Sequence, residues 1–336
     1  MNEKVLDQFH ESISRHRDVL QQWLNEGADQ KKILSGNASV PDVLSLIEEF
    51  KHLLEQVEHK SFGICKVCQG EVELDRLEQD CTTTVCLDCY TEEQLRELER
   101  DLELAAKVQD QLLPGFFPSI PGVNFAVRHQ SAHVVGGDYH DFVTLRNGQQ
   151  GFVIGDVMGK GLASSMLMSN LQASLRILGP DYENLDQLFS HLNRLFRFNL
   201  KLIRFISLFI GAIDASARKL SYCNAGHHSP VLWHSERGTI ARLDPTAPAI
   251  GLIARPEFRT QTIEVDTGDL LVLYTDGLTE ARDRRNQEFG EERLADFIRH
   301  NYILSAEEFT ARLWTAVKEF SGHHHDDTTL LVLKFV

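Results

Sequence analysis

Four short motifs in the second half of the sequence contain aspartates that could carry out chemistry. They are Val135-Gly136-Gly137-Asp138, Gly155-Asp156-Val157, Tyr274-Thr275-Asp276-Gly277 and Asp326-Asp327-Thr328-Thr329. Carboxylates at strand ends can converge from distant positions, and such hard oxygen ligands suit Mg²⁺ or Mn²⁺. Two such ions can bind phosphate and turn a bridging water into hydroxide. A lone Asp-Gly is more often a turn or a helix cap, so the predicted metal site rests on all four motifs together.

Two CxxC pairs form a second candidate metal site. The pairs are Cys65–Cys68 and Cys86–Cys89, and the seventeen residues between them suit one structural Zn²⁺ bound by four thiolates. Buried structural thiols or a redox pair are the alternative interpretation. Cys81 is spare in this count, and we interpret it as a structural thiol, with a redox sensor as the alternative.

Helical periodicity surrounds the cysteines. Apolar residues recur at helical intervals in residues 1–26 and 42–59, which predicts two amphipathic helices folded back as a hairpin. Residues 91–113 form a charged helix whose apolar positions alternate in steps of three and four. That seam fits a short coiled coil or a helix packed on its own domain, and the sequence does not decide between them. The predicted segments are a helical hairpin at 1–60, a zinc finger at 61–90, a linker helix at 91–113 and a second domain at 114–336.

The second predicted domain has a different sequence pattern from the first. From residue 123 onward, apolar runs rich in β-branched residues alternate with Gly and Asp turns, and helical stretches such as 161–178 and 291–319 lie between them. Strands interleaved with long helices are typical of packed α/β or α+β layers. We classify the whole chain as α+β.

Composition restricts the possible functions. The 336 residues suit two domains, 42% of them hydrophobic and 25% charged. A net charge of -15 argues against broad nucleic-acid binding. No apolar run approaches the roughly 18 residues of a membrane span, and the first residues lack the pattern of a signal peptide. We therefore expect a cytoplasmic protein with reduced cysteines.

Together with GDVMGKGLASSMLMSNLQASLR and NAGHHSPVLW, the acidic motifs resemble the SpoIIE/RsbU branch of the PPM-type, or type 2C, serine/threonine protein phosphatases. The resemblance spans about residues 95–336, including the QDQLLP helix end. It implies a β-sandwich flanked by helices, with two Mn²⁺ or Mg²⁺ ions at one end. It also implies a phosphoserine or phosphothreonine protein as substrate, namely a STAS-domain anti-sigma-factor antagonist in a partner-switching pathway.

The resemblance also implies roles for individual residues. The implied metal ligands are Asp138, Asp156, Asp276, Asp326 and the backbone carbonyl of Val157. Asp156 would bridge the two ions, and Asp327 is a further candidate because it adjoins a ligand. Met158 stands where some relatives have a histidine thought to protonate the leaving group, so a metal-bound water would take that role.

The lysine and histidines near these motifs are expected to have no catalytic role. We interpret Lys160 as solvated or ion-paired, with phosphate contact as the alternative. The histidines at 323–325 are expected to form a polar loop, because hard ions prefer carboxylate to imidazole. His227 and His228 are expected to serve as turn and packing residues.

The cysteine segment carries a second resemblance. FGICKVCQGEVELDRLEQ and VCLDC, preceded by a helical hairpin, are similar to the zinc finger of the DksA/TraR family over residues 1–95 at most. That family binds RNA polymerase through acidic residues at its hairpin tip. The predicted loop here lacks their DxxDxA pattern, so a sensory or scaffolding use is favoured over polymerase binding.

Several alternatives remain open at this level. In phosphatases of the resembling type the linker helix often joins two protomers, which makes a homodimer through residues 91–113 possible. The chain could instead be a zinc-dependent, transcription-associated binding protein whose phosphatase domain is a scaffold. It could also hydrolyse a small phosphorylated metabolite.

Overall fold

The structure, a computed structural model, forms two compact units. The N-terminal unit comprises residues 1–101 and 197–203, and the C-terminal unit comprises residues 102–196 and 204–336. The predicted boundaries at residues 60, 90 and 113 divide the chain more finely and stay predictions. The described residues are 5–7, 9–10, 13–14, 17–18, 21, 40–79, 81–115, 117–159, 161–199, 205–214, 216, 218–321 and 326–336.

The N-terminal unit is built on helix packing. Helix α3, Val40–Glu58, lies where the sequence predicted its second helix, and the described residues before it are helical. Leu6 and Ile13 from that earlier stretch share one buried apolar cluster with Phe50 of α3. The described parts therefore pack as expected for a helical hairpin. The predicted connecting loop, Leu20 and Leu24 lie outside the described residues.

The cysteine segment follows α3 and has little regular structure. Its elements are helix α4, Leu74–Gln79, and the 3-10 turn η1, Leu87–Cys89. Phe62, Val72 and Leu77 are buried in the same apolar cluster as the helices. This segment therefore has a core in common with the helical region instead of forming an isolated finger.

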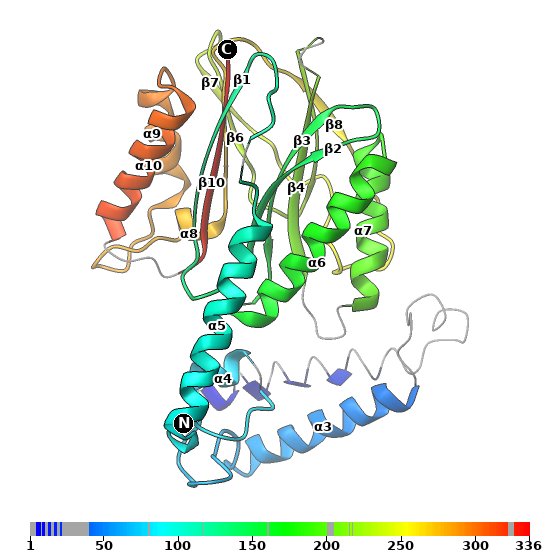
Figure 1. Cartoon of the computed structure of the whole chain (residues 1–336), viewed down its shortest axis with the longest axis vertical. Helices are drawn as coiled ribbons and strands as arrows, with labels where there is room; N and C mark the ends of the chain where they lie inside the picture. Colours follow the sequence, from blue (N-terminus) through cyan, green and yellow to red (C-terminus); the bar gives the residue numbers. More distant parts are fainter. Residues whose placement is uncertain are drawn as a thin grey trace. The chain divides into compact units, whose positions relative to one another are not determined.

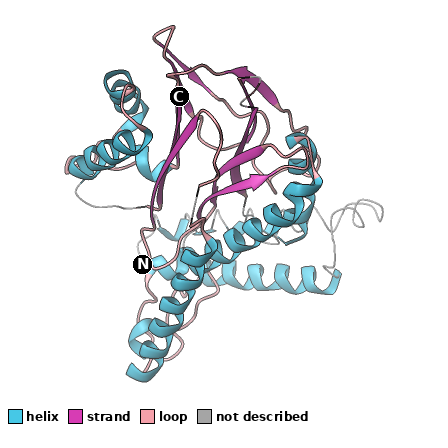
Figure 2. Cartoon of the chain, turned by 45° about the horizontal axis from the view of Figure 1, so that its top comes forward, coloured by secondary structure: helices cyan, strands magenta, loops and turns pink. Residues whose placement is uncertain are grey.

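The C-terminal unit is a sandwich of two five-stranded antiparallel sheets (Figures 1 and 2). The first sheet has the order β1-β10-β9-β6-β7: Val123–Gln130, Thr328–Phe335, Leu270–Tyr274, Val231–His234 and Thr239–Arg242. The second has the order β2-β3-β4-β5-β8: Asp138–Thr144, Gln150–Val157, Ile206–Asp214, Lys219–Ala225 and Gln261–Glu264. The expected α+β architecture, with a helical N-terminal region and a β-sandwich, is confirmed.

Strand alternation explains the long apolar runs. In β10, Leu331 and Leu333 lie in the core between the sheets, whereas Leu330 and Val332 pack in a second cluster with α9 and α10. Successive side chains point to opposite faces of a strand. A strand buried on both faces must therefore be apolar at nearly every position.

Helices cover both outer faces (Figure 1). Helix α6, Leu162–Leu178, packs on β2 and β3, with η2, Gly179–Asp181, and α7, Leu185–Asn199, following it. Helices α9, Gly290–Asn301, and α10, Ala306–Ser321, cover the first sheet, and the short α8, Asp276–Thr279, precedes them. Within the described ranges, no helix combines the length and the apolar character that crossing a bilayer requires.

One helical prediction needs correction. The stretch expected as helical over residues 291–319 is two helices, α9 and α10, separated near residue 303. The backbone N–H of Glu308 donates to the Ser305 hydroxyl at 3.2 Å. A serine with a glutamate three residues later is a helix-start signature, and it begins α10 after a turn.

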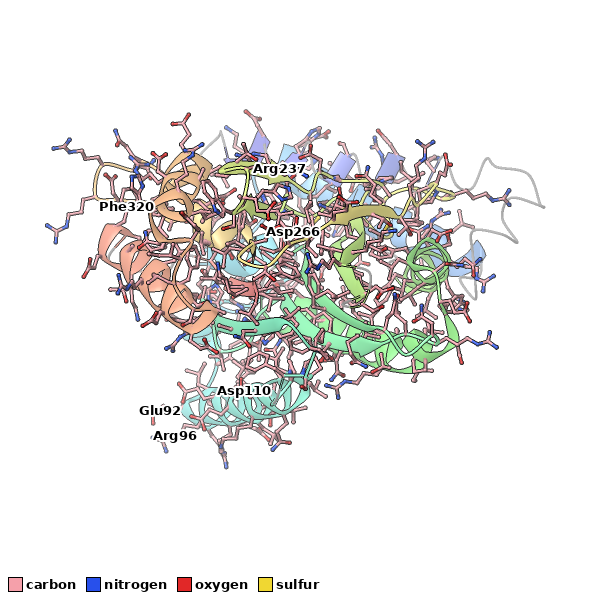
Figure 3. The ribbon with its side chains drawn as sticks, turned by 90° about the horizontal axis from the view of Figure 1, so that it is seen from above. Glu92, Arg96, Asp110, Arg237, Asp266 and Phe320 are labelled. Atoms are coloured by element: carbon pink, nitrogen blue, oxygen red, sulfur yellow. The ribbon has the colours of Figure 1, made fainter. Side chains whose placement is uncertain are left out.

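Helix α5, Glu92–Leu112, runs from the N-terminal unit into the C-terminal unit. Glu92 and Arg96 form an ion pair of 3.2 Å across its first turn (Figure 3). Near the other end, Gln109 is buried and hydrogen-bonded to Gly136, whereas Leu98, closer to the start of the helix, is 48% exposed. The last turns of α5 thus pack on their own domain, and dimerisation stays a prediction.

Candidate metal centres

Two of the predicted metal ligands lie directly opposite each other. Asp138 begins β2 and pairs in register with Asp156 on β3. Asp138 is fully buried, whereas Asp156 is half-buried. Burial, and next the charge of Asp156, raise the pKa of Asp138 well above its ordinary value. Two carboxylates placed this close favour a cation between or beside them.

Two threonine hydroxyls connect Asp138 to the other two acidic motifs. Thr275 and Thr329 both donate to Oδ2 of Asp138, at 2.7 and 2.6 Å. The Thr329 N–H donates to Thr275 Oγ1 at 2.8 Å, which joins the two threonines to each other. His129 lies behind them, with Nδ1 2.9 Å from Thr329 Oγ1. All four motifs are therefore gathered at one end of the sandwich.

Asp327 is held by backbone groups. Its Oδ1 accepts the Ala132 N–H at 2.8 Å, and its Oδ2 accepts the Gly137 N–H at 2.7 Å. Its side chain is 8% exposed. Both oxygens are thus engaged by the segment that leads into β2, so Asp327 anchors that segment, and its part in metal binding stays a prediction.

Asp276 and Asp326 lie near a common neighbour. Asp276 is the first residue of α8, Asp326 immediately precedes Asp327, and both are half-buried. Partial desolvation and the negative charges of Asp276, Glu288 and Asp326 raise the pKa of Glu280. The carboxylates of Asp276 and Asp326 therefore both act on the Glu280 carboxyl group, which indicates that they lie near each other.

The donor set fits divalent metal ions. Oxygen ligands from Asp138, Asp156, Asp276 and Asp326 are the hard donors that Mg²⁺ and Mn²⁺ prefer. The pKa of Asp138 is raised first by burial and next by the charge of Asp156, so a bound cation would stabilise its ionised form. These carboxylates are arranged more loosely than the cysteine thiols, which form the only group of three or more such ligand atoms within 4.8 Å in the described part of the chain.

The two residues that follow Asp156 are held by backbone hydrogen bonds. Val157 ends β3, and its N–H donates to the Gly137 carbonyl at 3.3 Å. Met158 is 42% exposed, with its N–H on the Phe205 carbonyl at 3.1 Å. Lys160 and the histidines at 323–325 lie outside the described residues.

Of the two adjacent histidines, His227 fits its predicted packing role, whereas His228 is exposed. His227 is buried, its N–H donates to Asn224 Oδ1 at 2.8 Å, and its Nδ1 lies 2.9 Å from Ser207 Oγ. Burial, then the neighbouring His228, lower the pKa of His227 to about 3. His227 is therefore a neutral packing group at ordinary pH.

Sequence reasoning missed several residues that support the site. Thr275 and Thr329 lie inside the acidic motifs, but only the aspartates were assigned roles. Gln109 interrupts the apolar positions of the helix predicted over residues 91–113, and a polar residue at such a position is a signal that it has a partner. His129 carried no local signal, because it meets Thr329 only through the pairing of β1 with β10.

Gly277 tests how tightly the site is packed. A Cβ at residue 277 would overlap the Asp327 carbonyl oxygen and lie 2.7 Å from Thr328 Oγ1. Gly277→Ala is therefore expected to destabilise the C-terminal unit by about 3 kcal/mol, which thermal unfolding would show as a melting temperature lower by roughly 10 °C. Gly115→Ala is the control, because a Cβ there meets nothing within 4 Å. Equal melting temperatures for the two variants would contradict the packing at Gly277.

The predicted zinc ligands form a compact tetrad in the N-terminal unit. The sulfurs of Cys65, Cys68, Cys86 and Cys89 all lie within 4.8 Å of one another. Three pairs are separated by 3.7, 3.5 and 3.6 Å. Four sulfurs at about 2.3 Å from a central Zn²⁺ would have separations of about 3.8 Å, whereas a disulfide measures about 2.05 Å. The geometry fits zinc and excludes disulfides.

Backbone N–H groups donate to two sulfurs of the tetrad and favour the thiolate form of Cys65. The N–H groups of Val67 and Cys86 each donate to Cys65 Sγ at 3.4 Å, and the Gly70 N–H donates to Cys68 Sγ at the same distance. Backbone hydrogen bonds from Cys68 and then Cys86 lower the pKa of the Cys65 thiol to about 6. Cys65 is thus already favoured as the thiolate that metal binding requires. Cys81 lies outside the tetrad.

Part of the N-terminal region is similar to a transcription factor. RNA polymerase-binding transcription factor DksA of Escherichia coli K12 is 38% identical over 52 residues, which are 16% of this chain and 34% of DksA. The matching share is 34% of DksA, so the similarity covers one segment and not the whole of that protein.

Two further proteins are similar over a longer stretch of this chain. Protein IcfG of Synechocystis sp. is 29% identical over 265 residues, covering 69% of this chain and 41% of IcfG. The phosphoserine phosphatase RsbU of Bacillus subtilis is 25% identical over 240 residues, covering 71% of each protein. The chain thus spans less than half of IcfG but most of RsbU.

The fold has solved counterparts. The SiaA-PP2C domain of Pseudomonas aeruginosa superposes with a TM-score of 0.63 at 19% identity, covering 72% of this chain and 98% of that domain. This likeness establishes a PP2C-type fold. Residues 146–336, more than half of the chain, match the family model of stage II sporulation protein E, SpoIIE. With the sandwich, the acidic motifs and this match in agreement, the chain belongs to the SpoIIE family.

Proposed function

We propose that this chain is a Mn²⁺- or Mg²⁺-dependent protein phosphatase acting on phosphoserine or phosphothreonine in a regulatory protein. One observation carries the proposal: the hydroxyls of Thr275 and Thr329 bind Asp138, which lies opposite Asp156 in register. Four separated acidic motifs thereby meet at one site. RsbU, which bears the name phosphoserine phosphatase, is similar over 71% of this chain.

The proposed ligands divide into three roles. Asp156 would hold both ions, Asp138 and the Val157 carbonyl would hold one of them, and Asp276 and Asp326 would hold the other. Such ions supply charge neutralisation at the phosphoryl oxygens and acidify a water molecule. Asp327 holds the segment before β2 in place, and the threonine hydroxyls bind Oδ2 of Asp138, so Oδ1 would be the oxygen left for an ion.

The implied substrate is a phosphorylated STAS-domain anti-sigma-factor antagonist, which places the chain in a partner-switching pathway. We propose a cytoplasmic location, because four reduced thiols are needed for the zinc site. The N-terminal unit then has a sensory or scaffolding role, and the linker helix joins it to the phosphatase domain. A homodimer through that helix is part of the proposal.

Phosphate release by the full chain tests this function. The substrates are a phosphoserine STAS-domain protein, an aryl phosphate and a set of small phosphorylated metabolites, each with Mn²⁺, with Mg²⁺ and with a chelator. We expect metal-dependent turnover with a higher kcat/KM for the phosphoprotein. A higher kcat/KM for a metabolite would show that the substrate is a small phosphorylated molecule instead of a phosphoprotein. Inactivity toward every substrate would favour a binding protein, to be tested against RNA polymerase.

A further inference from the structure

A single polar side chain of helix α5 holds the main chain beside the candidate metal centre. Gln109 is the one buried residue of this fully described helix, with 7% of its surface exposed. Its Nε2 donates to the Gly136 carbonyl at 2.7 Å, and its Oε1 accepts the Gly136 N–H at 3.1 Å. Both polar ends of the amide are therefore used on one residue.

Gly136 has no room for a side chain, because the Asp327 carboxylate lies against its Cα. A Cβ at this position would overlap the carboxylate of Asp327. That carboxylate also accepts the Gly137 N–H at 2.7 Å, and the Gly137 carbonyl accepts the Val157 N–H at 3.3 Å. The two glycines are thus held by α5, by Asp327 and by the end of β3 at once.

This short segment continues directly into the proposed ligands. Asp138 follows Gly137 in the chain, and Val157 follows Asp156. A displacement of Gly136 is therefore transmitted along the chain to Asp138, and through the hydrogen bond between Val157 and Gly137 to Val157. Interiors are close-packed and transmit such strain.

The side chains next to Gln109 do not share its position. Asp110 is exposed on the same helix (Figure 3), and Val108 is 50% exposed. The link between α5 and the segment at Gly136 is therefore specific to one side chain and can be removed without changing the helix surface around it.

We propose that Gln109 is a positioning residue for the candidate metal centre. Its amide sets the main chain at Gly136 and Gly137, and through them Asp138 and the Val157 carbonyl. Affinity for Mn²⁺ thereby depends on the two hydrogen bonds between Gln109 and Gly136. The inference rests on the proposed function only for the identity of the ions.

The test compares the wild type with Gln109→Met, which keeps an unbranched side chain of similar length but removes both hydrogen-bonding groups. Two backbone groups are then left without partners in a buried place, which is unfavourable. We expect Mn²⁺ binding, measured by titration calorimetry, to weaken by about tenfold. The value of kcat returns to that of the wild type at saturating Mn²⁺. Val108→Ala is the matched control on the same helix and should bind Mn²⁺ as the wild type does.

Amide hydrogen exchange tests the proposal without measuring enzymatic activity. The amides of Gly136 and Gly137 should exchange faster in Gln109→Met, while those of the central strand β10 stay protected. Mn²⁺ affinity within twofold of the wild type would overturn the proposal, as would a general loss of protection in β10, which would make Gln109 merely structural. A wild type that binds Mn²⁺ but hydrolyses no phosphoester would end the proposed function and leave this inference testable by binding alone.

Discussion

Replacing Asp156 by asparagine is expected to abolish phosphate release while making the metal-free protein more stable. Asp156 is the proposed bridge between the two ions, so its loss should lower kcat/KM by about three orders of magnitude or more, which corresponds to roughly 4 kcal/mol. Stability should change in the opposite direction, because Asp156 lies directly opposite the buried Asp138. Like charges facing each other across two strands destabilise a sheet by up to about 1 kcal/mol.

The pH dependence of stability separates this effect from ordinary damage. The pKa of Asp138 is raised in the folded protein, first by burial and next by Asp156. A group with a raised folded pKa stabilises most below its unfolded value, about 4 for Asp, and that contribution is lost as pH rises through the folded pKa. Without metal, stability should therefore fall as pH rises above about 4. The fall should be smaller in Asp156→Asn.

Denaturant unfolding in a chelator between acid and neutral pH measures this difference, and phosphate release with Mn²⁺ measures activity. Asp181→Asn, at an exposed position, is the matched control and should change neither quantity. Mn²⁺-dependent turnover by Asp156→Asn would remove Asp156 from the proposed centre. A variant that is inactive and also less stable would point to loss of fold.

The second large effect is expected in the N-terminal unit. Cys65→Ser should lower bound zinc from one ion to none and abolish cooperative unfolding of that unit. Structural zinc contributes about 10–16 kcal/mol in small zinc domains at neutral pH, which matches or exceeds the stability of a typical domain. The apolar cluster around the tetrad includes Phe62, Val72 and Leu77, so its order depends on the same segment.

Metal analysis would measure the bound zinc in Cys65→Ser, and hydrogen exchange would measure the loss of structure in its N-terminal unit. Cys81→Ser is the matched control, because Cys81 belongs to the same segment but not to the tetrad. It should keep one zinc ion and wild-type exchange. The C-terminal unit has its own two apolar cores, so its exchange should be unchanged in both variants. Retention of zinc by Cys65→Ser would disprove the four-thiolate site.

Local patterns were sufficient for several features. The CxxC spacing placed four thiols that do form a tetrad, because each pair closes a short turn that needs no distant contact. Apolar runs located β3, β4, β9 and β10, since strands buried on both faces carry an unmistakable composition. Helix α5 was evident from its charged periodicity, although its partner was not.

Other features depended on contacts between distant residues. The sequence determined that the chain is α+β, that it carries a four-cysteine site and that it places aspartates at strand ends and turns. Only the tertiary structure decided that Asp327 anchors a backbone segment, that Thr275 and Thr329 converge on Asp138, and that Gln109 binds Gly136. The pairing of β1 with β10 joins the two ends of the domain, and such contacts leave no trace in local periodicity. Hydrogen-bond partners are chosen by the geometry of the folded core, which neighbouring residues in the sequence do not specify.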